Sequence, residues 1–138
     1  MVGAELETAA LGPFRVTVDA ERAAAYSREV GFAPRADGSA PLCYPAVWLT
    51  APDIHASIAR VCAETDSVPV HESQSFAYDS PLRVGESYDL SLALRREETP
   101  PRLVIEAVVA ALGGEACARF ETMLRLVPRG GFGAEAPA

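Results

Sequence analysis

The sequence predicts an α+β fold in which a curled antiparallel sheet wraps around one central helix. After the first third of the chain, only residues 50–64 show clear helical periodicity, and the sequence that follows alternates with the period of β-strands. One amphipathic helix placed before several long strands is expected to cover the concave face of their sheet. The isolated helix and the strands behind it therefore define the predicted architecture.

The central helix, Thr50–Glu64, carries its apolar side chains on one side and its polar side chains on the other. Thr50 is the expected N-cap and Asp53 its capping-box partner. Pro52 lies in the first turn, where its missing N–H costs nothing. The apolar stripe consists of Ile54, Ile58, Val61 and Cys62.

The length and composition are those of an ordinary globular domain. The chain has 138 residues, of which 49% are hydrophobic and 22% are charged, so it is long enough to bury a core without disulfides or metals. We expect one domain over residues 1–138, with a core at about residues 14–127 and flexible termini at residues 1–12 and 128–138.

The charge and the cysteines restrict the possible partners. A net charge of -7 argues against nucleic acid and against an anionic membrane, because both would be repelled. The 3 cysteines form no Cys-x-x-Cys pair, and only 2 histidines are present, so no zinc site and no other metal site is predicted. Free cysteines, the lack of a basic leader and the lack of a long apolar run favour a cytoplasmic protein.

The first third of the chain predicts a strand, a helix and a loop. Phe14–Val18 alternates as a short strand, and Asp19 is placed to cap a helix over Ala20–Val30. Gly31 follows that helix as a C-terminal signal. Residues 32–41 contain several turn formers, and the apolar segment 42–49 then leads into the central helix.

Four strands are predicted behind the central helix, at residues 68–78, 87–95, 102–112 and 116–127. Gly113 and Gly114 predict a tight hairpin between the last two. The first of the four mixes polar and apolar side chains on one face, so it is the least purely structural. Open antiparallel edges invite pairing about a two-fold axis, and we therefore expect a dimer.

Two segments resemble the MaoC-like hot-dog family, which includes (R)-specific enoyl-thioester hydratases and 3-hydroxyacyl-thioester dehydratases. Residues 40–48, read APLCYPAVW, are similar to the segment that opens the hot-dog helix in N-terminal-type members. Residues 73–88 contain a Pro-Leu-x-x-Gly turn between two strands, which looks like the turn of that family. The resemblance covers roughly residues 14–127 and implies a hot-dog fold.

The same resemblance implies a substrate-holding subunit that lacks its own catalytic dyad. Catalytic members place an Asp and then an Asn-Pro-x-His segment after the first helix, but Phe32 stands at the Asp position here and the first histidine is His55. By likeness, the ligand would be an acyl-CoA or acyl-carrier-protein thioester, and Pro41, Tyr44 and Trp48 would line its acyl channel. The chain would act as a homodimer or with a catalytic hot-dog subunit.

Both histidines remain weak candidates for acid–base chemistry. His55 borders the apolar stripe of the central helix, where a histidine bonded to a backbone carbonyl is the commoner arrangement. Strand alternation places His71 on a small polar face with Ser73 and Ser75, which is either solvent-exposed or a thioester groove. His71 is thus a candidate for substrate binding as well as catalysis. Glu72 is expected on the opposite face.

Asp53 carries the main alternative function, because several hot-dog thioesterases use an acidic residue of the central helix as base or nucleophile. A carboxylate in a first helical turn also stabilises the helix by about 0.5 to 1 kcal/mol without any chemistry, and we favour that role. Cys43 has no histidine or cation nearby in sequence to activate it. A binding or regulatory module without turnover is a third hypothesis.

No cofactor is predicted, since no glycine-rich phosphate loop precedes a helix anywhere in the chain. The phosphates of a coenzyme A or carrier-protein arm would require arginine side chains at strand ends. The candidates are Arg83, Arg95, Arg96, Arg102 and Arg125.

Overall fold

The computed structural model describes residues 8–31 and 37–130. A single antiparallel sheet has the strand order β1-β3-β4-β5-β2, so β1 and β2 form its two edges. The elements in chain order are β1 (Thr8–Thr17), α1 (Ala20–Val30), the 3-10 helix η2 (Tyr44–Thr50), α2 (Pro52–Ala63), β2 (Ser67–Tyr78), β3 (Ser87–Glu98), β4 (Pro101–Ala111) and β5 (Ala116–Pro128).

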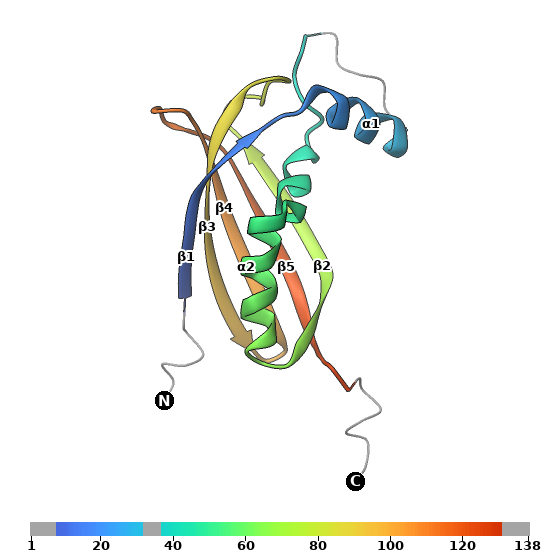
Figure 1. Ribbon diagram of the computed structural model, residues 1–138, viewed down its shortest axis with the longest axis vertical. Coiled ribbons are helices and arrows are strands. Elements are labelled where there is room, and N and C mark those ends of the chain that lie inside the picture. Colours follow the sequence, from blue (N-terminus) through green and yellow to red (C-terminus); the bar gives the residue numbers. More distant parts are fainter. Residues whose placement is uncertain (1–7, 32–36, 131–138) are drawn as a thin grey trace.

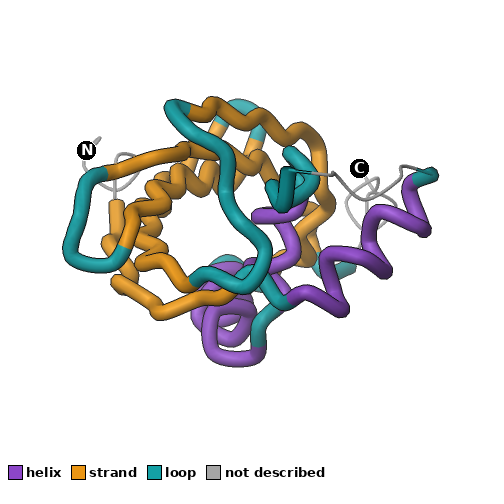
Figure 2. Tube along the Cα trace, turned by 90° about the horizontal axis from the view of Figure 1, so that it is seen from above, coloured by secondary structure: helices purple, strands orange, loops and turns teal. Residues whose placement is uncertain are grey.

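Helix α2 lies along the concave face of the sheet, as the sequence predicts (Figure 1). Viewed from above, the strands curl into an arc whose open side is closed by α2 (Figure 2). Ile54, Ile58 and Cys62 are buried and form the contact face of the helix. Each fully buried Ile contributes roughly 1.5 to 3 kcal/mol relative to exposure. This apolar contact holds α2 against the sheet.

The four predicted strands behind α2 and the hairpin at Gly113 are confirmed, but the first strand was predicted too short. β1 begins at Thr8, inside the stretch expected to be flexible. Gly12 has φ +96°, and the register with β3 shifts between Leu11 and Phe14, so Gly12 and Pro13 form a bulge within the strand instead of ending it. Residues 1–7 and 131–138 of the predicted flexible termini lie outside the described residues.

Helix α1 has the predicted caps. The Asp19 carboxylate accepts a hydrogen bond from the Arg22 N–H at 2.8 Å, and Gly31 adopts the left-handed conformation with φ 87°. The predicted cap of α2 is wrong, because the Thr50 hydroxyl donates to the Val47 carbonyl at 2.6 Å within η2. This 3-10 turn occupies Thr50, so α2 begins at Pro52.

Helix α1 projects away from the sheet, and a short ladder of two loops lies beneath it (Figure 1). Ala40 N–H donates to Leu82 O at 2.7 Å, and Val84 N–H donates to Gly38 O at 3.0 Å. Only Ala23 and Ser27 of α1 are buried among its described side chains. The loops thus give α1 its only seat on the domain.

Candidate functional site

A β-bulge at Glu72 reverses the faces that simple alternation predicts for β2. His71 lies opposite Leu124 and Ser73 lies opposite Met123, so Glu72 is the extra residue. His71 consequently lies on the concave face, together with Gln74. The predicted grouping of His71 with Ser73 and Ser75 is wrong because the bulge separates them.

On the convex face, Glu72 is clamped by two arginines. Its Oε1 lies 2.6 Å from Arg102 Nε, and its Oε2 lies 2.5 Å from Arg125 Nη2. These arginines are direct cross-strand neighbours on β4 and β5, so the carboxylate offsets their mutual repulsion. The hydrogen bond from Arg102, followed by the nearby positive charges, lowers the pKa of Glu72. The prediction that Glu72 faces away from His71 is confirmed.

On the concave face, His71 belongs to a hydrogen-bonded cluster with Gln74 and Thr122. His71 Nε2 lies 3.1 Å from Gln74 Oε1, and the Thr122 hydroxyl donates to the same oxygen at 2.8 Å. Gln74 Nε2 donates to the Glu121 carbonyl at 3.1 Å. Thr122 is only 2% exposed, whereas His71 is exposed. A buried network therefore holds an accessible imidazole.

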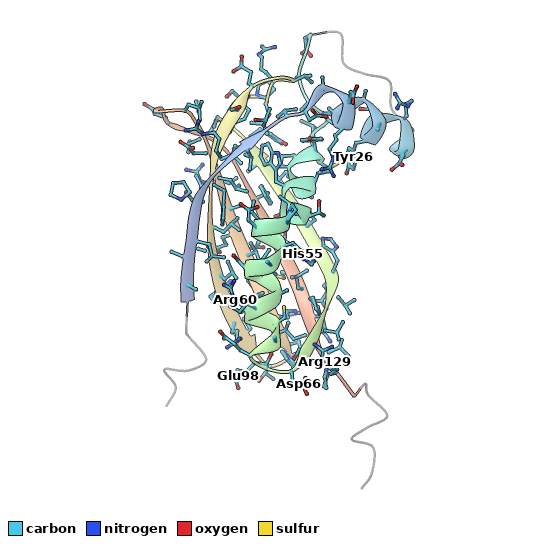
Figure 3. All side chains as sticks on the ribbon, viewed as in Figure 1. Tyr26, His55, Arg60, Asp66, Glu98 and Arg129 are labelled. Atoms are coloured by element: carbon cyan, nitrogen blue, oxygen red, sulfur yellow. The ribbon has the colours of Figure 1, made fainter. Side chains whose placement is uncertain are left out.

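Helix α2 faces this cluster with the flank that carries His55. Arg96 of β3 donates to the Val61 carbonyl at 2.7 Å and to the Glu64 carboxylate at 2.9 Å, which fixes one flank of α2 toward β3. At 100° per residue, His55 lies half a turn away from Glu64 and so faces β2. Figure 3 shows His55 between α2 and β2. We call His55, Ala59, His71 and Gln74 the α2–β2 surface.

Tyr44 and Trp48, predicted to line an acyl channel, are core side chains. They are 1% and 5% exposed, and their rings meet edge to face with centroids 6.0 Å apart. The Trp48 indole N–H donates to the Thr17 carbonyl at 3.1 Å, which satisfies its one polar atom. Burial raises the pKa of Tyr44. Their role in a channel stays a prediction.

Pro41 borders a cavity of about 230 Å³ beneath α1. Most of its wall consists of small apolar side chains, together with the hydroxyl residues Ser27 and Ser39. Sequence reasoning identified only Pro41, because the cavity arises where α1 crosses two loops that are distant in the chain. The lining residues are Ala20, Ala23, Ala24, Ser27, Gly38, Ser39, Pro41 and Val84.

The cysteines are not placed as nucleophiles. Burial raises the pKa of both Cys62 and Cys117, which leaves their thiols protonated and unreactive. The Tyr26 hydroxyl donates to Cys43 Sγ at 3.1 Å, and this bond, with burial and the nearby thiol, raises the pKa of Tyr26 to about 12. Within residues 8–31 and 37–130, no group of three or more His, Cys, Asp or Glu side chains could hold a metal ion.

The five candidate arginines for phosphate binding all have protein partners. Arg102 and Arg125 bind Glu72, and Arg96 binds α2. Arg95 pairs with Glu97 at 3.6 Å, and Arg83 donates to the Asp37 carbonyl at 2.8 Å. Phosphate binding by any of them would require that partner to be exchanged.

The geometry can be compared with that of known proteins. The chain superposes on the C-terminally truncated HadBC (3R-hydroxyacyl-ACP dehydratase) complex of Mycobacterium tuberculosis with a TM-score of 0.69 and 17% identity, covering 86% of this chain and 96% of that chain. The (R)-hydratase of A. caviae involved in PHA biosynthesis gives a TM-score of 0.51 and 16% identity, with coverages of 88% and 95%. A gentisyl-coenzyme A thioesterase gives 0.55 and 9%, with coverages of 82% and 85%.

The chain has the hot-dog fold. This confirms the fold class predicted from the helix and strand pattern. Hot-dog proteins that resemble it in structure include dehydratases, hydratases and thioesterases. Neither protein-family models nor curated proteins match the sequence.

Two predicted features bear on placement in the cell and on the dyad. None of the helices in the described part of the chain combines the length and hydrophobicity needed to cross a membrane. Phe32, which stands at the position of the catalytic Asp in the family resemblance, lies outside the described residues. The two histidines of the sequence lie on α2 and β2, not on the segment that follows α1.

Proposed function

We propose that this hot-dog protein binds an acyl thioester as a MaoC-like, substrate-holding subunit of the N-terminal type and that it works in the cytoplasm. The observation that carries the proposal is the hot-dog fold, at a TM-score of 0.69 to a 3R-hydroxyacyl-ACP dehydratase complex, in a chain with no histidine after its first helix until His55. Such a subunit holds the acyl chain, and a partner supplies the Asp and His.

A dimer, with a second copy or with a catalytic hot-dog subunit, is part of the proposal. Strand β2 spans 12 residues and pairs only with β5, so its outer edge is free among the described residues. Val68 and Val70 on this edge strand are 40% and 49% exposed. A long edge with exposed apolar side chains favours pairing with another chain. A partner there would lie next to the α2–β2 surface.

Asp53 is the residue on which a thioesterase would depend, and its geometry supports the capping role instead. The side chain is exposed, and its carboxylate accepts the Ile54 N–H at 2.9 Å at the start of α2. Asp53→Asn keeps an oxygen that can accept this bond. If Asp53 only caps the helix, the variant should retain any thioester activity of the chain; loss of thiol release would favour the thioesterase.

The test of the proposed function uses the purified chain alone. A trans-2-enoyl-CoA is added, and loss of the enoyl absorbance, release of thiol and binding are followed together. Binding without either reaction is the expected result, and addition of a hydratase-type subunit from the same source should then yield a stoichiometric complex. Hydration by the chain alone would contradict the missing dyad, and failure to bind any acyl-CoA would contradict the function itself.

A further inference from the structure

The hydrogen bonds around Gln74 determine which nitrogen of His71 carries the proton. Gln74 Nε2 donates to the Glu121 carbonyl, which fixes the orientation of the amide, so Gln74 Oε1 is the atom that faces Thr122 and His71. A carbonyl oxygen only accepts hydrogen bonds. His71 Nε2 must therefore carry a proton, and in the neutral ring Nδ1 is left with its lone pair as a hydrogen-bond acceptor.

The bulge at Glu72 makes this arrangement possible. Residues three apart in a regular strand point to opposite faces, whereas the extra residue puts His71 and Gln74 on the same concave face. Thr122 is 2% exposed, so the bond to Gln74 satisfies a hydroxyl that would otherwise be buried without a partner. The orientation of His71 thus follows from a network that the core itself requires.

The same face becomes apolar immediately beyond Gln74. Phe76 and Tyr78 are the next concave residues of β2, and their rings stack with centroids 6.5 Å apart. Phe76 also contacts Phe120 of β5 at 5.8 Å. An acceptor nitrogen at one end of a half-buried aromatic row suits a ligand with one hydrogen-bond donor attached to an apolar chain.

We propose that His71 accepts, at Nδ1, a hydrogen bond from the hydroxyl of a 3-hydroxyacyl thioester, and that Gln74 is its positioning residue. This proposal rests on the proposed function and specifies its substrate class. The carbonyl and sulfur of a thioester only accept hydrogen bonds, so they cannot bind a lone pair. The acyl hydroxyl is a donor, and an enoyl or saturated acyl chain lacks it.

The first test measures the tautomer of His71 by ¹⁵N NMR of the imidazole in the full chain at about pH 8, where an unperturbed histidine is neutral. The Nε2–H tautomer should dominate in the wild type. In Gln74→Met, which keeps the shape of the side chain but removes the amide, this bias should be lost. A wild-type His71 with its proton on Nδ1, or a bias that survives in Gln74→Met, would overturn the proposal.

The second test compares (R)-3-hydroxybutyryl-CoA with butyryl-CoA, two probes that differ by one hydroxyl, by calorimetric titration. One neutral hydrogen bond contributes about 0.5 to 1.5 kcal/mol, so the wild type should bind the hydroxyacyl probe about 2- to 10-fold more tightly. His71→Phe and Gln74→Met should bind the two probes equally. Ser73→Ala, on the convex face of the same strand, is the matched control and should keep the preference.

The outcomes separate this proposal from the proposed function. If the wild type binds both probes equally, the role of His71 is overturned while thioester binding stands. A preference that persists in a folded His71→Phe variant would also overturn it. If neither probe binds, the proposed function fails, and the proposal fails with it. Circular dichroism verifies the fold of each variant, and Gln74→Met provides the comparison if His71→Phe does not fold.

Discussion

Glu72 Oε1 lies 2.6 Å from Arg102 Nε on the convex face of the sheet, directly behind the concave cluster of His71 and Gln74. Both contacts depend on the same bulge in β2. The ion pair holds the extra residue outward, and the strand can then present His71 and Gln74 inward together. The charge on Glu72 is therefore coupled to the orientation of an imidazole on the other side of the sheet.

Glu72→Gln should lower the stability of the protein at neutral pH, because the variant keeps the shape but loses the charge that the two arginines bind. The pKa of Glu72 is lowered in the folded state, so its contribution is present above the unfolded value of about 4.5 and is lost as the pH falls through the folded pKa. The measurement is urea denaturation of both proteins from pH 7 downward, in which the difference between their midpoints should shrink.

The matched control for this prediction is Glu106→Gln, which removes one negative charge from the same convex face of β4. It should not reproduce the acid dependence of Glu72→Gln. If both variants changed in parallel, the effect would come from net charge and not from the clamp. Because the clamp is partly exposed, high salt should also reduce its effect.

Gly12→Ala should destabilise the edge strand β1. Gly12 has φ +96°, and a Cβ built there would lie 2.7 Å from the Leu90 carbonyl oxygen of the neighbouring strand. Left-handed backbone costs a non-glycine residue roughly 1 to 2 kcal/mol, and here the clash with backbone is added. Gly31→Ala is the control, since Gly31 also has positive φ but nothing lies within 4 Å of its Cβ position. Urea denaturation should show the larger loss for Gly12→Ala.

The bulges at Gly12 and Glu72 explain where the sequence was and was not sufficient. The amphipathic stripe of α2 and the alternation of the later strands are strong local signals, and both predicted the fold. Gly12 and Pro13 look like strand breakers, but their neighbours on β3 keep them in the sheet. Nothing local marks Glu72 as an extra residue, because its two arginine partners lie 30 and 53 positions away in the chain.

The candidate site was predicted less well for a related reason. His71 was identified from the sequence, yet its neighbours were assigned by strict alternation, and one bulge exchanges Ser73 for Gln74. Gln74 and Thr122 are 48 residues apart, so only the pairing of β2 with β5 brings them together. Local pattern predicts which residues are polar, but long-range register decides which of them meet.

Trp48→Ala should cost about 3 to 5 kcal/mol of stability, which is typical of a buried Trp truncated to Ala. Trp48→Phe should cost less, about 1 to 3 kcal/mol, mainly because the Thr17 carbonyl loses its donor. Trp48 is the single tryptophan, so unfolding of both variants is followed by far-UV circular dichroism. A nearly neutral Trp48→Ala would instead indicate a side chain that lines open space, as the channel prediction requires.

Tyr26→Phe should change the alkaline stability of the protein. The hydrogen bond to Cys43, then burial, raises the pKa of Tyr26 from 10.0 to about 12, so the folded state holds this proton more tightly than the unfolded chain. The resulting stability is fully present below about pH 10 and is lost as the pH rises toward 12. Wild type should therefore lose more stability than Tyr26→Phe over this interval in urea denaturation.

The ultraviolet difference titration between wild type and Tyr26→Phe isolates the ionisation of this one phenol from those of the other tyrosines. It should show a midpoint well above 10 in the wild-type background. Cys43→Ala tests the cause, because it removes the hydrogen-bond partner while the ring of Tyr26 keeps its edge contact with Tyr44. In that variant the Tyr26 midpoint should move back toward 10, and an unchanged midpoint would assign the shift to burial alone.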